Sequence, residues 1–533
     1  MSLLLAIDVG TLSARAGLFD ASGRLVAACS HPFELLRPAE NHAVYRMDEI
    51  WAAVCAAIRA AIADAPGAAA AIAGVAIDAT SSTYFETKGG RPLLGDADVV
   101  CWMDHRSERE AEEIGASGDR YLDHVGGTVS PEMYLPKILW VKRHTPEAWA
   151  RVTAVRDLSD EVARRVTGVD RHSVCGLACK FPYLPADPDP WRRELLTTLG
   201  LSDLLQRGKL AEPPGLVGEV HGTVSADAAK ALGIAPGAPV AVGLIDAEAG
   251  ALGVMGHGFR DRMNRTLALI GGTSSCYMCW AEDERRISGV WGPFKDAVFP
   301  GYWMHEAGMS ISGAALDTVL DQHPASPGKP SAARHAETAR DILALLDLEG
   351  PAFGARRHIV PDWLGNRAPH GDGAVRALVS GIGLETSPRS FLEHYYATAR
   401  ALALQSRHIL EHLNTRGYAI DRACLSGGHA RNPLMVRLYR DALGADLVIS
   451  HSPEPVLLGT AMVASVAAGL YPDLFAALDA MAPEQTIHKA DPLWTAANDA
   501  AYSTYLKLFA IRNEIEAEGR RPAGRPSASA GAF

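Results

Sequence analysis

Two turns in the sequence place hydroxyl side chains beside glycine, between short apolar runs. One lies in AIDVGTLSARAG, residues 6–17, and the other in ALIGGTSSCYMC, residues 268–279. Glycine permits the left-handed backbone angles and the close approach that let backbone N–H groups surround an anion. Either turn alone is most simply a hairpin, but the repetition indicates an internal duplication and favours two phosphate-binding turns, one in each half of the chain.

Two carboxylates stand near these turns. Asp8 ends the first apolar run, and it is the candidate to hold Mg²⁺ on a bound phosphate, through a water molecule. Asp246, in GLIDAEAG, follows another apolar run and precedes a glycine-rich turn. A carboxylate at such a strand end could accept the proton of a hydroxyl that attacks a phosphorus atom, or it could simply cap the next helix.

The elements that must carry these residues alternate between strands and helices. Apolar runs predict strands at 3–10, 14–20, 25–32 and 71–80, and a 3.6-residue period predicts helices at 47–65 and 391–413. The small-residue run 457–470 predicts a helix that packs closely against a neighbour. The pattern indicates an α/β protein with two domains, 1–243 and 244–512, followed by a disordered tail at 513–533.

Composition narrows the class of protein. The 533 residues are 48% hydrophobic and 21% charged, with a formal net charge of −11. This balance suits a globular protein and gives no basic footprint for nucleic acid. The N-terminus lacks a charged leader and a spanning segment, so we expect a cytoplasmic protein without a membrane partner. A homodimer is an alternative that the residues leave open.

Two patterns in the sequence resemble zinc-binding motifs. The pairs Cys175/Cys179 and Cys276/Cys279 lie in apolar, strand-like runs without the turn residues of a zinc knuckle, so we interpret them as buried thiols. HILEH, residues 408–412, has the spelling of an inverted zinc protease, whose two histidines share a helix face. No third ligand is evident in the sequence, and peptidase activity is the weakest of the hypotheses.

From about residue 3 to about residue 510, the chain resembles the FGGY carbohydrate kinases. The resemblance rests on AIDVGTLSARAGLFD, LIGGTSS and LSGGHARNPLMVRLYRDALG, which occur in the order and at the spacing of that family. The segments WMDHRSEREAEEI, GGTVSPEMYLPKILWV, VCGLACKF, GLIDAEAGALG and HEAGMSISGAALD resemble the ribulokinase-like branch. The resemblance implies two actin-like ATPase (ribonuclease H-like) domains that close on ATP and a sugar across an interdomain cleft, with Mg²⁺ as the metal.

The resemblance also implies residue roles. Asp246 would be the catalytic base, flanked by the hydroxyl-binding groups Lys180 and Glu306, with further sugar contacts from Thr80, Ser81, Asp104, Arg106 and Glu132. A lysine and a glutamate in apolar segments are costly to bury unpaired, which supports a site on independent grounds. The nucleotide would be bound by Asp8, Gly10, Thr11, Ser13, Arg15, Gly271, Gly272, Thr273, Gly313, Asp317, Gly427, Gly428 and Asn432.

One segment departs from the D-ribulose-phosphorylating members of the family. Those members carry Thr-Cys-Ser-Leu-Val, whereas this chain reads DATSSTYF, with Ser81 in place of the cysteine and Thr83 and Tyr84 in place of the apolar pair. We expect Thr83 and Tyr84 to line the sugar pocket. A ketopentose, most simply ribulose, is therefore the expected substrate, with xylulose or a pentitol as alternatives. A regulator that binds nucleotide without transferring phosphate is the alternative of another class.

Overall fold

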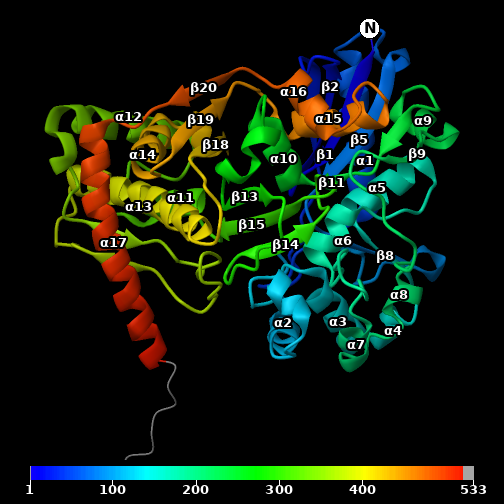
Figure 1. The fold of residues 1–533 in the computed structure, drawn as a ribbon, viewed down its shortest axis with the longest axis horizontal. Coiled ribbons are helices and arrows are strands. Elements are labelled where there is room, and N and C mark those ends of the chain that lie inside the picture. The colour runs from blue at the N-terminus through cyan, green and yellow to red at the C-terminus, as the bar shows by residue number, and fades with distance from the viewer. Residues whose placement is uncertain (1, 520–533) are drawn as a thin grey trace, which may run out of the picture.

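The computed structural model describes residues 2–519, in which two seven-stranded sheets face each other (Figure 1). The first sheet has the order β3-β2-β1-β5-β10-β9, with β11 paired to β5, and the second has the order β14-β15-β13-β12-β18-β19-β20. In each sheet, an antiparallel pair joined by a Gly-Thr turn (β1–β2, β12–β13) lies beside a parallel strand (β5, β18). The matching strand order confirms the predicted α/β class and the internal duplication.

The strands of the first sheet are β1 (Leu3–Val9), β2 (Ser13–Asp20), β3 (Leu25–Pro32), β5 (Ile72–Ala79), β9 (Val220–Thr223), β10 (Pro239–Ala241) and β11 (Leu244–Ile245). Those of the second are β12 (Thr266–Gly271), β13 (Ser275–Ala281), β14 (Trp291–Lys295), β15 (Trp303–Met309), β18 (Arg422–Gly427), β19 (Asp446–Ser450) and β20 (Gln485–His488). A smaller sheet, β4-β7-β6-β8, is formed by Val44–Tyr45, Val99–Val100, Thr83–Thr87 and Val152–Asp157.

The inner strands of both central sheets, such as β1, β5 and β12, are buried on both faces, as their nearly continuous apolar sequences require. In β1, Leu3, Leu5 and Ile7 pack on the outer side with α1 (Met47–Ala63), α5 (Leu158–Thr167) and α9 (Ala226–Leu232). Leu4 and Ala6 point the other way, toward the second sheet. The outer face of the second sheet is covered by α11 (Gly313–Gln322), α12 (Ala332–Glu349), α13 (Pro388–Asn414), α14 (Pro433–Ala442) and α17 (Pro492–Gly519).

Two helices fill the space between the sheets. Helix α15 (Pro455–Ala467) packs on β1 and β5, whereas α10 (Asp246–Met255) packs on α15 and β12 (Figure 1). A Cβ atom at Gly253 would overlap the backbone of Pro455, and one at Gly459 would overlap that of Ala249. The glycines let the two backbones approach, which confirms the close packing predicted for the run 457–470.

The division of the chain differs from the predicted one in two places. Strand β11 extends the first sheet past the predicted boundary at residue 243, and α15 returns from the C-terminal half to cover that sheet. Helix α17 continues to Gly519. The prediction of a disordered tail from residue 513 is therefore wrong for residues 513–519. Residues 520–533 lie outside the described part of the chain. Between residues 2 and 519 the structure contains no helix with the length and apolarity needed to span a membrane.

Candidate active site

Three buried strand ends bring three aspartates together. Asp8 on β1 is the register partner of Asp78 on β5, and Asp246 follows β11, which pairs in parallel with the end of β5. The carboxyl ends of parallel strands meet at one edge of a sheet, so the three carboxylates share that edge. Asp8 and Asp78 are fully buried, and each keeps one oxygen, Oδ1, without a hydrogen-bond partner.

Burial and mutual repulsion set the charge of this three-aspartate edge. Burial raises the pKa of Asp8 and raises that of Asp78 well above its ordinary value, with the charge of Asp8 adding to the shift at Asp78. Burial and then the charge of Asp8 raise the pKa of Asp246 to about 7. Arg15 offsets part of the repulsion, because it pairs with Asp8 and donates from Nη1 to Glu454 at 3.0 Å. Such an edge can hold a cation and can accept a proton near neutral pH.

Asp78 is a site residue that the sequence reasoning did not single out. It belongs to a repeated signal, because Ile-Asp closes all three strand segments, as AID at 6–8, AID at 76–78 and LID at 244–246. Its other carboxylate oxygen accepts a hydrogen bond from Thr460 of α15. This bond ties the returning helix to the three-aspartate edge.

A second charged cluster, formed by Lys180, Glu306, Arg367, Glu132 and Trp291, joins three of the predicted sugar-binding residues, namely Lys180, Glu306 and Glu132. Lys180, the last residue of α6 (Val174–Lys180), donates to Glu306 of β15 at 3.3 Å, and both side chains are nearly fully buried. Arg367 pairs with the other oxygen of Glu306 and lies 4.0 Å from Glu132. Lys180 and Arg367 face the Trp291 ring, 4.6 and 3.9 Å from its centroid. This sugar-side cluster therefore presents fixed charges next to Asp246, whose pKa Lys180 lowers.

Lys137 was also missed, and it links the sugar-side cluster to the first Gly-Thr turn. It is buried on α3 (Tyr134–His144), where its ammonium donates to the Trp102 carbonyl at 2.8 Å and to that of Glu132 at 3.2 Å. The Trp102 indole in turn donates to the Thr11 hydroxyl at 3.2 Å. Burial lowers the pKa of Lys137 to about 8. A lysine within the apolar run YLPKILWV was the available signal, whereas nothing in the local sequence marked Arg367.

Asp104 and Arg106 bind each other rather than the sugar-side cluster. Both donor–acceptor distances in this bidentate pair are 2.7 Å, and Asp104 also accepts from the backbone of Ala43 at 2.6 Å. Thr80 and Ser81 follow β5 directly, beside the three-aspartate edge, with Thr80 3.1 Å from the Ser82 hydroxyl.

The expectation that Thr83 and Tyr84 line the pocket is wrong for Tyr84. Its side chain packs in the outer core with residues of α1 and α5, and the charges that act on its hydroxyl are those of Glu161, Asp98 and Arg165. Thr83 is buried on β6, paired with Val100 and Asp157. The tyrosine of DATSSTYF therefore belongs to the outer core, and Ser81, which follows β5 directly, is the changed residue that lies nearest in sequence to the three-aspartate edge.

Three glycine loops meet at the second Gly-Thr turn. Gly271 and Gly427 are register partners on β12 and β18, and Gly313 donates its N–H to the Gly272 carbonyl at 2.8 Å. A Cβ at Gly313 would lie 2.6 Å from the Gly272 oxygen, and one at Gly271 would lie 2.7 Å from the His429 ring. Gly427 has a φ of +81°, which side chains disfavour. Packing therefore requires glycine at Gly271, Gly313 and Gly427, apart from any ligand, whereas a Cβ at Gly10, Gly272 or Gly428 would make only ordinary contacts.

The remaining predicted nucleotide residues are divided between open and structural positions. Thr273 is exposed, Thr11 and Ser13 are half-buried, and Gly10 closes its turn by donating to the Ser13 carbonyl at 3.0 Å. Asn432 caps α14 by accepting from Leu434 at 3.0 Å, and Asp317 pairs with His335 at 2.8 Å. Gly428 begins a short 3₁₀ turn after β18.

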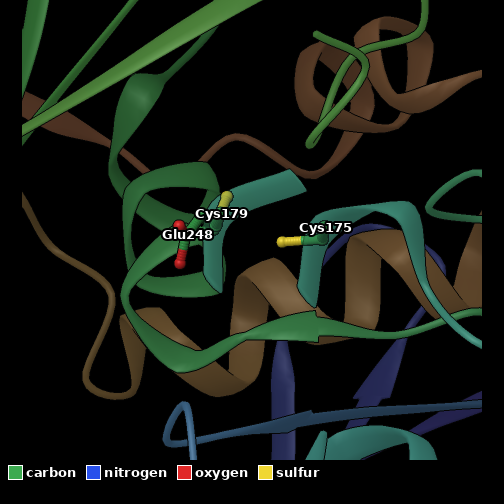
Figure 2. A group of neighbouring side chains, drawn as sticks. All are labelled: Cys175, Cys179 and Glu248. Carbon is green, nitrogen blue, oxygen red and sulfur yellow. The ribbon is translucent and has the colours of Figure 1, made fainter. Parts of the chain in front are cut away.

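Cys175 and Cys179 lie on one face of α6, so the strand-like interpretation of that run is wrong. Their sulfur atoms and a carboxylate oxygen of Glu248 all lie within 4.8 Å of one another (Figure 2). Within residues 2–519 this is the one group of three or more His, Cys, Asp or Glu side chains whose ligand atoms all lie so close to one another. His408 and His412 of α13 instead contact Tyr505 and the Ser288 carbonyl, and the nearby His370 ring has its centroid 5.8 and 6.4 Å from theirs.

Comparisons with known proteins match nearly the whole chain. Residues 3–253 match the model for the N-terminal domain of the FGGY family of carbohydrate kinases, and residues 267–468 match the model for its C-terminal domain. An FGGY carbohydrate kinase domain-containing protein of Xenopus laevis is 32% identical over 96% of this chain and 97% of its own length. A D-ribulokinase of Saccharomyces cerevisiae is 30% identical over 86% of this chain and 71% of its own. The fold matches a xylulose kinase structure from Rhodospirillum rubrum with a TM-score of 0.77 at 22% identity, over 97% of this chain and all of that one.

Proposed function

Because this chain belongs to the FGGY family of carbohydrate kinases and is thus a sugar kinase, we propose that it transfers the γ-phosphate of ATP to a hydroxyl of a ketopentose, with ribulose as the first candidate. The proposal of ribulose is supported by the similarity to ribulokinases along most of the chain. The observation that carries the proposed chemistry is the position of Asp246, which belongs to the three-aspartate edge and is also close enough to the sugar-side cluster to feel the charge of Lys180.

Asp246 is the proposed base. As the sugar oxygen bonds to the γ-phosphorus, its proton passes to the Asp246 carboxylate, the bond from phosphorus to the bridging oxygen breaks, and ADP leaves with that electron pair. The carboxylate oxygen that accepts from the Ala247 backbone at 2.8 Å is held in place, and the helix N-terminus supports the charged form. A pKa of about 7 places the exchange of this proton near neutral pH.

The sugar-side cluster is proposed to orient the sugar. Lys180 supplies donors and Glu306 acceptors, and their ion pairing to each other and to Arg367 holds both side chains in position before the sugar arrives. Hydroxyls that meet such preorganised partners are distinguished from analogues that leave those partners unpaired. The Ser81 segment next to Thr80 would contact the other side of the sugar.

The residues present fit a divalent cation. Asp8 Oδ1 and Asp78 Oδ1 are buried acceptors without partners, and hard cations such as Mg²⁺ prefer carboxylate oxygen. Asp8 would hold the ion, and Asp78, its register partner on β5, would supply a second carboxylate next to Asp8. When bound, Mg²⁺ would offset the negative charge of the transferred phosphate.

The glycine loops of the second half are proposed to bind the nucleotide. Gly271, Gly272 and Thr273 would approach the phosphates, while Gly313, Gly427 and Gly428 would border the adenosine. The loops contact one another closely and leave no room for Cβ atoms at Gly271, Gly313 and Gly427, which keeps their backbone N–H groups at a defined separation.

A coupled assay of ADP release tests the proposal. The purified protein would be given ATP, Mg²⁺ and, in turn, D-ribulose, L-ribulose, D-xylulose, the pentitols and glycerol. We expect one ketopentose to give the highest kcat/KM, with D-ribulose first. If D-xylulose or a pentitol gives the highest kcat/KM, that compound and not ribulose is the substrate. ADP release that none of these compounds stimulates would overturn the proposal.

A further inference from the structure

Beside the sugar-side cluster lies a buried group of three side chains with no assigned role. Cys175 and Cys179 project from one face of α6, and Glu248 projects toward them from α10, two residues after Asp246 (Figure 2). Their sulfur and oxygen atoms lie within 4.8 Å of one another, and all three side chains are at most 1% exposed.

Glu248 is the unusual member of this Cys175–Cys179–Glu248 group. Neither of its carboxylate oxygens has a hydrogen-bond partner, although both are buried. The nearby Lys180 ammonium donates to Glu306 instead. A buried carboxyl group without partners loses its hydration and gains no hydrogen bond in return, which destabilises the folded protein. An apolar side chain at this position would pack against the same neighbours without that loss of stability.

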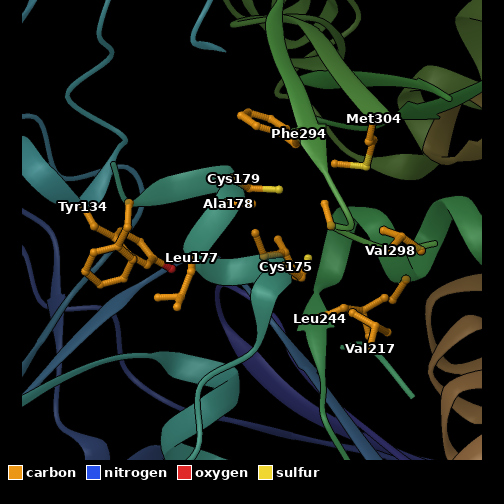
Figure 3. Packing of buried hydrophobic residues seen from close by; sticks show 14 of the residues in the cluster. Tyr134, Cys175, Leu177, Ala178, Cys179, Val217, Leu244, Phe294, Val298 and Met304 are labelled. Carbon is orange, nitrogen blue, oxygen red and sulfur yellow. The ribbon is translucent and has the colours of Figure 1, made fainter. Parts of the chain in front are cut away.

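The surroundings hold the group in place. Helix α6 is embedded in apolar side chains, among them Leu244, Phe294 and Met304 (Figure 3). Ser173 caps α6 through the Cys175 N–H and donates its hydroxyl to the Gly243 carbonyl at 2.7 Å, which joins the start of α6 to the strand before Asp246. The separation between the two thiols and Glu248 is thus set by the backbone of two anchored helices.

We propose that Cys175, Cys179 and Glu248 bind a thiophilic divalent cation, Zn²⁺ in the first place. Two thiolates and a carboxylate are a ligand set that zinc accepts, and the hard cations Mg²⁺ and Ca²⁺ disfavour sulfur. With zinc bonds of about 2.3 Å to sulfur and 2.0–2.2 Å to oxygen, ligand atoms in a tetrahedron lie roughly 3.5–3.8 Å apart. The three side chains would supply three of the four tetrahedral positions, and rotations about their side-chain bonds would bring ligand atoms that already lie within 4.8 Å of one another to these separations.

The ion would link the two helices that carry the catalytic and sugar-binding side chains. Cys179 directly precedes Lys180 on α6, and Glu248 lies two residues after Asp246 on α10. A metal shared by α6 and α10 would therefore fix the distance between the proposed base and the lysine. This role is structural and does not depend on which sugar, if any, the protein phosphorylates.

Metal content tests the proposal directly. The full-length protein would be dialysed against a weak chelator to remove loosely held ions, and its zinc measured by inductively coupled plasma mass spectrometry. We expect one zinc ion per chain. After zinc is replaced by Co²⁺, we expect the intense near-ultraviolet charge-transfer band of a cobalt–thiolate bond. Less than about a tenth of an equivalent of zinc, together with no such band on adding Co²⁺, would overturn the proposal.

Variants locate the ion. Cys175→Ser and Cys179→Ser should each reduce the intensity of the cobalt–thiolate band, and the double variant should abolish it. Glu248→Gln should weaken zinc binding at least about tenfold. Cys424→Ser, at a buried thiol of β18 outside the group, is the matched control and should keep one zinc. Zinc retained by a folded double variant would place the ion elsewhere and refute the site. If the variants do not fold, the cobalt spectrum of the unaltered protein still decides. Zinc content and sugar-stimulated ADP release are separate readouts, so either proposal can fail alone.

Discussion

The two Gly-Thr turns of this protein share a backbone plan and differ in charge. In the first sheet, Asp8 pairs in register with Asp78, and in the second sheet the pair at the corresponding point is Ile270 with Ser426. The first turn adjoins buried carboxylates and Arg15, whereas the second adjoins glycines so closely packed that Cβ atoms would collide. The first Gly-Thr turn is therefore surrounded by charged side chains, and the second is surrounded by backbone groups of glycine residues.

This difference separates two tasks that phosphoryl transfer needs. Carboxylates near the reacting atoms can hold a cation and accept a proton, but they would repel phosphate if they surrounded it on all sides. Backbone N–H groups attract phosphate without adding a charge that must be buried. We therefore expect changes at the charged side to act on kcat or on the sugar, and changes at the glycine side to act on ATP.

The largest effect is expected from Asp246→Asn. Loss of the base should lower kcat by about 10²- to 10⁴-fold, while the Kd for ATP, measured by calorimetry, changes little. Asp227→Asn, at the exposed start of α9, is the control and should leave kcat unchanged. A kcat of Asp246→Asn within a few-fold of the unaltered protein would remove the aspartate from its role as base.

The next effect is expected from Lys180→Met. Loss of a buried partner of Glu306 should raise the KM for the sugar by about 100-fold, equivalent to roughly 2.7 kcal/mol, with the KM for ATP nearly constant. Lys142→Met removes a lysine that pairs with Asp203 at 2.5 Å in a partly exposed position, and it should alter neither constant. Equal rises in both KM values would mean that the two sides of the site are not separate.

Gly427→Ala probes the glycine side. Its φ of +81° and the overlap of a Cβ with the Gly271 carbonyl should displace the loop and raise the KM for ATP by about tenfold or more, at a cost of roughly 1–3 kcal/mol. Gly444→Ala is a matched control, because its φ is +73° and nothing lies within 4 Å of its Cβ. If both variants behave alike, backbone strain and not the contact between loops explains the effect.

The smallest effect is expected from pH. The base must be ionised, so kcat/KM should rise with pH up to about 7, where the raised pKa of Asp246 lies, and then level off. At pH 6 the loss is about tenfold relative to the plateau. A profile that stays flat between pH 5.5 and 8 would show that the ionisation of this carboxyl group does not limit turnover.

The sequence analysis and the structure agree where a local pattern carried the signal. The Gly-Thr turns, the strand ends at Asp8 and Asp246 and the close packing of residues 457–470 were all predicted from short segments. Asp78, Lys137 and Arg367 were missed, because their significance comes from neighbours on other strands and helices. Tyr84 was placed wrongly, since alternation along β6 turns it toward α1 and α5 while Thr80 and Ser81 precede that strand.

The sequence by itself determined the duplicated α/β plan, the family resemblance and the types of side chain available for the chemistry. Hydrophobic periodicity encodes which face of an element is buried, and that information is local. Only the tertiary structure decided that three Ile-Asp strand ends share one edge, that α15 returns to the first sheet, and that Glu248 meets two thiols of α6. These are contacts between segments far apart in the chain, and they depend on how whole layers pack rather than on any one segment.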